Sequence, residues 1–192
     1  MIDWKNIKKA ADVSLQEIPL DLDKPDPYLP EDKQLIKDTM KEILKASGQA
    51  SGEEDINDEL YRIAVRGKPY RILEDGKPAG IGVTGYFDNY DDKTRKSYSG
   101  QSVNDLGLLP QYQNHGTGRA ALKLLIKEMM KQNPKWLHIA HANINKRAGH
   151  LYRDIGFSRP LDWDNKATSL HMKAKEAKKL IKQWNKETGN KQ

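Results

Sequence analysis

The apolar residues of this chain recur with two different periods along its length. In residues 31–46 they recur every three or four positions, as on one face of a helix. Residues 118–132 and 175–188 show the same spacing, and Pro134 would end the first of these two helices. We therefore expect three long helices, each with one apolar face.

The patterns of strands appear between these helices. Residues 70–74 and 80–87 flank Asp75-Gly76, a dipeptide that favours a tight hairpin turn, so they predict two antiparallel strands. Residues 88–96 are polar enough to form an exposed loop. Residues 98–109 are expected to form the strand that follows this loop.

The second half of the chain adds a crossover. Residues 136–142 follow a helix and predict a buried strand, which would pair parallel with the strand before that helix. Residues 146–155 predict a helix, because an asparagine precedes them and a glycine follows them as a pair of caps would. Residues 169–172 predict a last strand.

The first third of the chain is harder to interpret. Four prolines in residues 1–30 predict an irregular or partly helical lead-in, and residues 47–53 predict a loop. Residues 54–65 fit a helix in their first half, whereas residues 61–65 alternate as a strand would. If residues 61–65 are counted as the first strand, residues 98–109 are the fourth. The expected fold class is α/β, with a mixed, mostly antiparallel central sheet flanked by helices.

The composition limits the class of protein. The chain has 192 residues, 36% of them apolar and 31% charged, with a mean hydropathy of −0.87, which suits one domain with a sizeable core. No apolar run approaches the roughly 18 residues of a membrane span, and the first residues lack the apolar stretch of a signal peptide. The absence of cysteine excludes disulfides and thiolate catalysis. We expect a cytoplasmic protein with no membrane partner.

The net charge of +6 is concentrated at the C-terminal end. Residues 173–192 contain seven lysines and two glutamates, whereas residues 1–33 carry a net charge of −3. A basic tail can attract nucleic acid. The chain lacks the interleaved aromatic and basic residues that stack on bases, so we interpret the tail as a solvated helix face and expect no nucleic-acid partner.

The turn between residues 98–109 and the helix 118–132 is a candidate binding site for an anion. The first amides of a helix have no carbonyl partner, and together with the helix dipole they attract an anion. Gly116 and Gly118 leave room for a phosphate beside the backbone. Four further residues add polar groups around this turn: Gln113, Asn114, His115 and Thr117. A P-loop is excluded because Arg119-Ala120 follows Gly118, and a dinucleotide fingerprint lacks its acidic residue about 20 positions later.

Two motifs resemble the signatures of the GNAT (GNAT-fold N-acetyltransferase) superfamily. Gln113-x-x-Gly116-x-Gly118 resembles its pyrophosphate-binding motif, and residues 145–157, NKRAGHLYRDIGF, match all five specified positions of its second signature, N-x-x-A-x-x-x-Y-x-x-x-G-F. The resemblance spans residues 70–173 and implies a single GNAT domain. In that domain the acetyl-CoA-binding core is 70–173, the helical lead-in is 1–55, and a basic C-terminal helix is 174–192.

The resemblance also implies where acetyl-CoA would bind. The cofactor would lie in a V-shaped split between the fourth and fifth strands, with its pantetheine arm paired to the strand end at Leu108 and Leu109. Its diphosphate would take the backbone amides from Asn114 to Arg119. Asn145 would contact the pantetheine arm near the acetyl group, a role compatible with that of a helix N-cap.

Tyr152 would be the general acid of the reaction that the resemblance implies. After a primary amine attacks the thioester, the departing CoA sulfur carries negative charge, and a phenol of pKa about 10 can protonate it. Amides at the strand end can stabilise the developing oxyanion. By itself, Tyr152 also fits a core tyrosine one helical turn after Ala148. The expected activity is transfer of acetyl from acetyl-CoA to a primary amine by direct attack.

At the positions where the family has its general base, this sequence does not match the family's pattern. Well-studied members use an acidic residue or a histidine at positions that align to Ser102 or Asn104, and neither of these accepts a proton strongly. Asp105 comes next, but strand alternation would turn it to the opposite face. The remaining candidates are bulk water, Glu74, His138 and His141.

The acceptor and the partners are less defined. No metal is expected, since His138 and His141 would face opposite sides of a strand. The acidic residues 88–92 would attract a cationic acceptor or form a solvated loop. Two alternatives stay open: a non-catalytic acyl-CoA-binding regulatory module, because the base is missing, and an aminoacyl-tRNA-directed acetyltransferase, because of the basic tail. The sequence does not distinguish a monomer from a homodimer.

Overall fold

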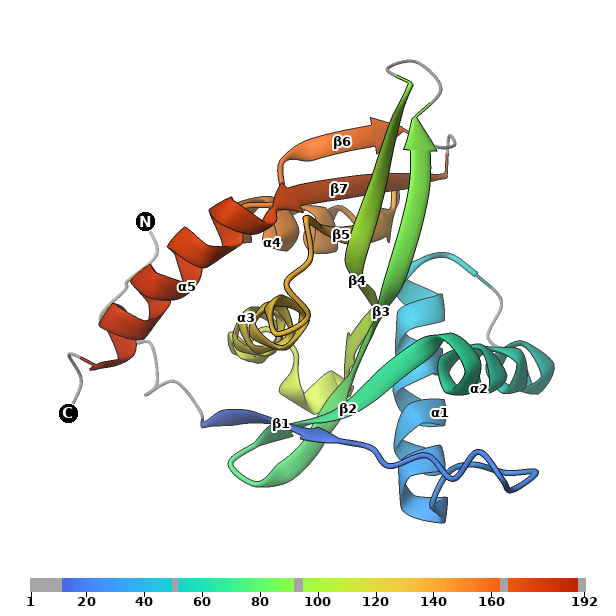
Figure 1. Ribbon diagram of the computed structural model, residues 1–192. Helices are drawn as coiled ribbons and strands as arrows, with labels where there is room; N and C mark the ends of the chain where they lie inside the picture. The colour runs from blue at the N-terminus through green and yellow to red at the C-terminus, as the bar shows by residue number, and fades with distance from the viewer. Residues whose placement is uncertain (1–11, 50–51, 92–94, 163–165, 190–192) are drawn as a thin grey trace.

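A computed structural model of the chain describes residues 12–49, 52–91, 95–162 and 166–189 (Figure 1). Its strands are β1 (Val13–Glu17), β2 (Gly67–Glu74), β3 (Lys77–Asp91), β4 (Lys96–Leu108), β5 (Trp136–Ala142), β6 (Arg159–Asp162) and β7 (Ala167–Lys173). Its α-helices are α1 (Pro30–Ala46), α2 (Glu53–Arg66), α3 (Thr117–Met130), α4 (Lys146–Ile155) and α5 (Ala174–Gly189). In these parts of the chain, no helix is long and apolar enough to cross a membrane.

The strands form one mixed sheet in the order β1-β2-β3-β4-β5-β7-β6. Neighbouring strands are antiparallel except β4 and β5, which are parallel and are joined through α3. The expected fold class, α/β with a mixed and mostly antiparallel sheet flanked by helices, is confirmed.

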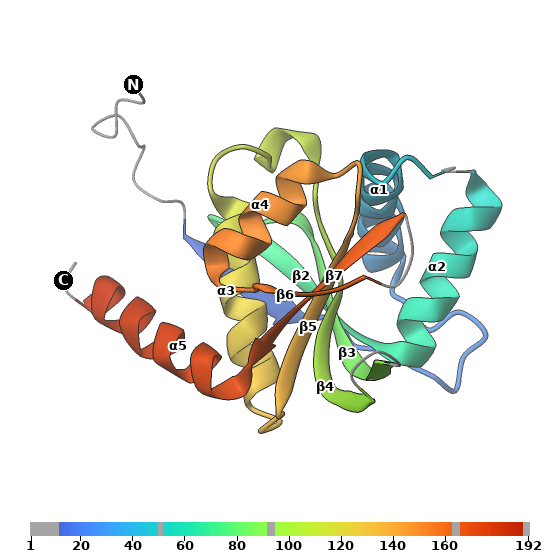
Figure 2. The same ribbon diagram turned by 90° about the horizontal axis from the view of Figure 1, so that it is seen from above.

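Helices cover both faces of the sheet. Ile81 and Val83 of β3 pack in one apolar layer with α1 and α2. Val103 and Ile139, on β4 and β5, pack in a second layer with α3, α4 and α5. Figure 2 shows α1 and α2 on one side of the strands and α3, α4 and α5 on the other. The three helices expected from their apolar spacing, α1, α3 and α5, each bury one apolar face.

The hairpin expected around Asp75-Gly76 is confirmed, but the next one is longer than expected. The register of β3 with β4 continues to Asp91↔Lys96, so the expectation of a loop over residues 88–96 is wrong for most of that range, and residues 92–94 lie outside the described residues. Figure 1 shows this hairpin projecting beyond the sheet. Polar residues can take part in this backbone pairing because antiparallel strands do not need to be covered on both faces.

The first strand lies elsewhere than expected. β1 pairs with β2 at the sheet edge, so the expectation of an irregular or partly helical lead-in is wrong for Val13–Glu17; residues 1–11 lie outside the described residues. α2 covers the stretch in which residues 61–65 were counted as a strand, and that expectation is wrong too. Ile63 is buried while Tyr61 is 73% exposed, as on two sides of a helix. β4 is still the fourth strand, because β1 takes the first place. β6 was not expected.

A buried ion pair fixes α1 to the sheet. Asp32, in the first turn of α1, is fully buried, and its carboxylate accepts a hydrogen bond from Arg71 Nη2 of β2 at 2.7 Å and a second one from Arg71 Nε. The position near the start of the helix also favours a negative charge. This pair holds the start of α1 against β2.

Replacing Asp32 by alanine is expected to lower the free energy of unfolding by about 3 kcal/mol, because Arg71 would keep its charge in a largely buried place without its partner. Urea denaturation measures the loss. Asp38→Ala is the matched control on the same helix: Asp38 pairs with Lys41 at 3.6 Å in an exposed place, and we expect a loss below about 0.5 kcal/mol. Equal losses for the two variants would contradict this assignment.

Candidate functional site

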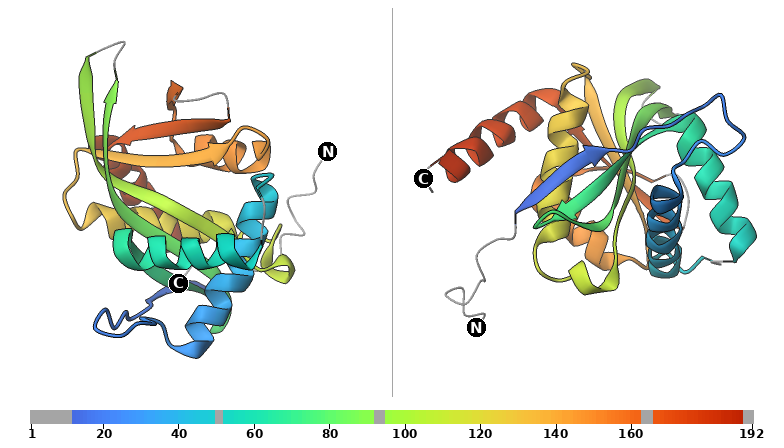
Figure 3. Two further views of the ribbon diagram at one scale, coloured as in Figure 1. Left: turned by 90° about the vertical axis from the view of Figure 1, so that its right-hand side faces the viewer. Right: turned by 90° about the horizontal axis from the view of Figure 1, so that it is seen from below.

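The parallel strands β4 and β5 separate near the middle of the sheet. They pair only from Gly100↔Trp136 to Val103↔Ile139. Beyond that point β4 stays paired with β3, and β5 stays paired with β7. The left view in Figure 3 shows the two strands diverging. A cavity of about 1320 Å³ lies at this split and extends to the start of α3.

The edge of β4 that faces the split has unpaired backbone groups. Leu109 N donates to Ala79 O at 2.9 Å, so this amide points toward β3 and away from the split. Backbone groups alternate along a strand, so those of Leu106 and Leu108 point toward β5, and no described strand pairs with them there. Leu108 O accepts a hydrogen bond from Gln113 Nε2 at 2.9 Å. An extended ligand can therefore pair with the free groups of this edge.

The turn below the split presents free amides. Gly116, the N-cap of α3, has φ 92°, a conformation that favours glycine. Ala120 N makes the first backward bond of the helix, to Gly116 O at 3.0 Å. The amides of Thr117, Gly118 and Arg119 come before it and have no partner within the helix. Gly116 has no side chain that could cap these amides, so they can bind an anion.

The predicted residues of this turn differ in their contact with the cavity. Gln113, Asn114, Gly116, Gly118 and Arg119 line it. His115 and Thr117 are not among its lining residues. The buried Thr117 hydroxyl donates to the carboxylate of Glu74, which places Glu74 beside the start of α3.

Helix α4 brings the two residues of the second motif to the other wall. Asn145 Oδ1 accepts from Ala148 N at 3.1 Å, which confirms the N-cap, and the residue also lines the cavity. Tyr152 lines the cavity too, although it is only 7% exposed. Its burial, and secondly the nearby carboxylate of Asp105, raise the pKa of the Tyr152 phenol. The hydroxyl therefore stays protonated at neutral pH and can donate a proton.

A β-bulge changes the direction of side chains on β4. Val83 pairs with Asp105 and Thr84 pairs with Val103, so the intervening Asn104 has no partner on β3. Such an extra residue interrupts the alternation of side chains along a strand.

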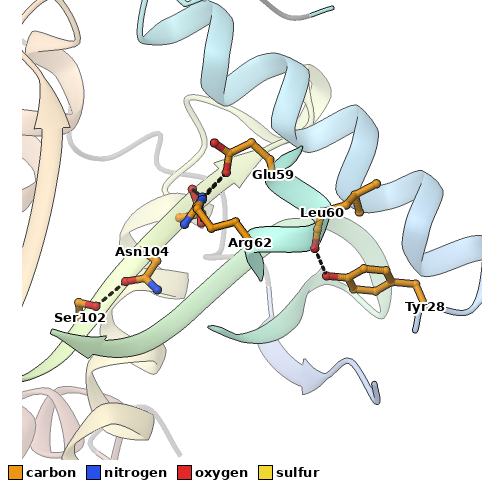
Figure 4. Close-up of polar contacts among 7 residues, drawn as sticks. Tyr28, Glu59, Leu60, Arg62, Ser102 and Asn104 are labelled. Carbon is orange, nitrogen blue, oxygen red and sulfur yellow. Dashed lines mark hydrogen bonds and ion pairs between the residues drawn. The ribbon is translucent and has the colours of Figure 1, made fainter. Parts of the chain in front are cut away.

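The bulge brings three polar side chains to the α2 side of the sheet. The Ser102 hydroxyl donates to Asn104 Oδ1 (Figure 4), and the Asp105 carboxylate accepts two hydrogen bonds from Arg62 of α2. The expectation that Asp105 faces away from Ser102 and Asn104 is therefore wrong. Asp105 and Asn104 both line the cavity.

The three side chains expected as alternative bases lie in different places. His138 packs against Phe87 and His171, with ring centroids 4.9 and 4.8 Å away, and its burial lowers the pKa of His138 to about 4. Neither His138 nor Glu74 is a lining residue of the cavity. His141 is one, and its ring centroid lies 6.1 Å from that of Tyr152.

Sequence reasoning missed the wall of the cavity that α1 and α2 form. The end of α1 with Glu42, and Glu59 with Arg62 on α2, line the cavity together with Asp105. Arg119 and Arg147, at the starts of α3 and α4, line the cavity as well. The cavity thus combines a part rich in carboxylates with a part that suits an anion. The signal was present in the sequence, because Glu59 and Arg62 flank the apolar stripe of a helix that the strand-like alternation concealed.

A mixed sheet split between two parallel strands, above a helix start with free amides, is the architecture of an acetyltransferase fold. Residues 35–157 match the acetyltransferase (GNAT) family, and the chain belongs to this family. No curated protein matches the chain.

Solved structures resemble it over most of its length. A GNAT family acetyltransferase from Elizabethkingia anophelis with acetyl-CoA bound is 18% identical, with a TM-score of 0.54, over 84% of this chain and 97% of that one. Spermidine N-acetyltransferase from Vibrio cholerae, in complex with CoA and spermine, is 15% identical, with a TM-score of 0.58, over 86% and 97%. A mutant AtaT toxin bound to the C-terminus of the antitoxin AtaR is 15% identical, with a TM-score of 0.60, over 90% and 98%. At these identities the likeness establishes the fold.

Proposed function

We propose that the protein is an acetyl-CoA-dependent N-acetyltransferase that acts on a primary amine by direct attack. The observation that carries the proposal is the placement of Asp105 and Tyr152 in one cavity, above the free amides that begin α3. The carboxylate of Asp105 suits the role of proton acceptor, and the phenol of Tyr152 suits that of proton donor. Acetyl-CoA or CoA is bound in the Elizabethkingia and Vibrio structures, which supports acetyl-CoA as the co-substrate here.

The cofactor would use the surfaces that the split leaves free. The amides of Thr117, Gly118 and Arg119 would bind its diphosphate. The pantetheine arm would pair with the edge of β4 at Leu106 and Leu108, because the amide of Leu109 is already bonded to Ala79. Asn145 would lie near the acetyl end. His115 has no assigned side-chain contact in this arrangement.

The chemistry follows from Asp105 and Tyr152, which line the same cavity. The acceptor ammonium gives a proton to Asp105, and the free amine attacks the thioester carbonyl carbon, so that a C–N bond forms and a tetrahedral oxyanion develops. The Leu106 amide would stabilise that charge. The C–S bond then breaks, and Tyr152 donates its proton to the leaving thiolate. The nitrogen then loses its second proton, which returns to Tyr152 through solvent, and Asp105 releases the first proton to solvent.

Release of CoA in the presence of acetyl-CoA and a panel of amines (peptides, polyamines, aminoglycosides and aminoacyl-tRNA) tests the proposal. We expect turnover with at least one amine. Binding of acetyl-CoA without any turnover would favour a non-catalytic acyl-CoA-binding module instead. Turnover restricted to aminoacyl-tRNA would make the acceptor a tRNA-linked amine.

Asp105→Asn is expected to lower kcat at least about a hundredfold, because an amide cannot accept the ammonium proton. The affinity for acetyl-CoA, measured by calorimetry, should stay near that of the unmodified protein. Asp58→Asn, at an exposed position of α2, is the matched control and should leave both values unchanged. An unchanged kcat in Asp105→Asn would remove Asp105 from this role.

A further inference from the structure

Helix α2 supplies a charged group to the carboxylate that faces the split. Arg62 Nη2 lies 3.1 Å from Asp105 Oδ1 and 2.9 Å from Asp105 Oδ2. Arg62 Nε donates to Glu59 Oε2 at 2.5 Å. The side chain of Asp105 is 7% exposed, that of Arg62 is 34% and that of Glu59 is 26%. One guanidinium thus joins a buried carboxylate to a more exposed one.

The guanidinium is carried by a firmly packed helix. Ile56, Leu60 and Ile63 bury the inner face of α2. The buried Tyr28 hydroxyl, from the segment before α1, donates to Leu60 O at 2.8 Å, and Figure 4 shows this bond beside Glu59 and Arg62. The helix is therefore held at Leu60, which lies between Glu59 and Arg62 in the sequence.

The two charged residues of α2 shift the pKa of Asp105 in opposite directions. Burial raises the pKa of Asp105, the positive charge of Arg62 lowers it, and the negative charge of Glu59 raises it. Tyr152 of α4 lies near enough for the charge of this carboxylate to raise the pKa of its phenol, and Glu42 of α1 and His141 of β5 line the same cavity. Of these, Arg62 makes the direct hydrogen bonds.

We propose that Arg62 is a positioning residue that holds the Asp105 carboxylate toward the split, and that Glu59 is the second partner which keeps Arg62 paired when Asp105 takes the acceptor's proton. This inference rests on the proposed function. A protonated Asp105 attracts the guanidinium far less than its carboxylate does, and a partly buried guanidinium without a partner is costly. Because Glu59 already binds Nε, the exchange of a proton at Asp105 needs no movement of α2.

The dependence of kcat on pH, at saturating acceptor, separates this role from a merely structural one. Activity should fall on the acid side as Asp105 becomes protonated. Arg62→Gln removes the charge that favours the ionised form, so the ratio of kcat at pH 6 to kcat at pH 8 should fall about tenfold below that of the unmodified protein. Glu59→Gln removes the opposing charge and should move the acid limb to lower pH. The two variants should therefore shift the limb in opposite directions.

Two further variants act as controls. Arg62→Lys keeps the charge but lacks the planar fork, so it should lower kcat while leaving the acid limb close to that of the unmodified protein. Because it keeps the ion pair, it also provides a folded variant if Arg62→Gln unfolds. Arg66→Gln, one turn further along the exposed side of α2, should change neither quantity.

The outcomes separate the two proposals. If an amine is turned over but neither Arg62→Gln nor Glu59→Gln moves the acid limb, the role of α2 is overturned while the proposed function stands. A shift of both variants in the same direction overturns it as well. If no amine is turned over, both proposals fail.

Discussion

Replacing Tyr152 by phenylalanine is expected to lower kcat at least about a hundredfold while acetyl-CoA binds with nearly unchanged affinity. The change removes one hydroxyl and keeps the shape of a side chain that is only 7% exposed. The phenol is protonated over the whole neutral range, since burial raises its pKa further, so its O–H can hydrogen-bond to the leaving thiolate and pass it the proton as the C–S bond breaks. Without it the thiolate would leave as an unstabilised anion.

The CoA-release assay measures the loss of rate, and calorimetry measures the affinity. Tyr70→Phe is the matched control: Tyr70 is equally buried in the core but lies outside the cavity, so its replacement should leave kcat unchanged. If Tyr152→Phe turns over as fast as the unmodified protein, the general-acid assignment is wrong.

Replacing Gly118 by aspartate is expected to weaken acetyl-CoA binding about a hundredfold, or about 2.7 kcal/mol, without weakening the fold. A Cβ at this position meets Leu108 at 3.6 Å and Leu151 at 4.0 Å, which are ordinary contacts. A negative charge in the first turn of a helix is favourable, so the urea midpoint should stay the same or rise. A bound diphosphate would instead be repelled.

Gly118→Asn separates the effect of charge from that of size, because asparagine has nearly the same shape as aspartate but carries no charge. Calorimetry should show a clearly smaller loss of affinity for it than for Gly118→Asp. An unchanged affinity in Gly118→Asp would mean that no phosphate lies at the start of α3.

The sequence predicted those elements whose pattern of apolar and capping residues is contained within the element itself. Residues 136–142 and 146–155 coincide with β5 and α4, because a buried strand and a capped amphipathic helix are defined by local residues. The edge strand β1 was missed, since only one strand pairs with it and its apolar alternation is short. The pairing of residues 88–91 with 96–99 was missed because these residues are mostly polar, and the backbone of antiparallel strands pairs whether the side chains are polar or apolar.

The candidate site divides in the same way. The part proposed to bind the cofactor depends on residues close together in sequence, such as Gly116 with Gly118 and Asn145 with Tyr152, and two motifs indicated it. The part proposed to bind the acceptor depends on contacts between distant residues, since Arg62 and Asp105 are separated by 43 positions. The bulge at Asn104 turned Asp105 toward α2, and a regular strand period could not have predicted that.

The central claim, that the split between β4 and β5 and the start of α3 bind one CoA molecule, is tested most directly by following backbone amide resonances during a titration with CoA. We predict that the amides of Leu106, Leu108, Thr117, Gly118 and Arg119 shift together with one saturation curve. The amide of Leu109, bonded to Ala79 O, should shift less. Absence of any shift, or shifts confined to residues outside the split and the start of α3, would contradict the account.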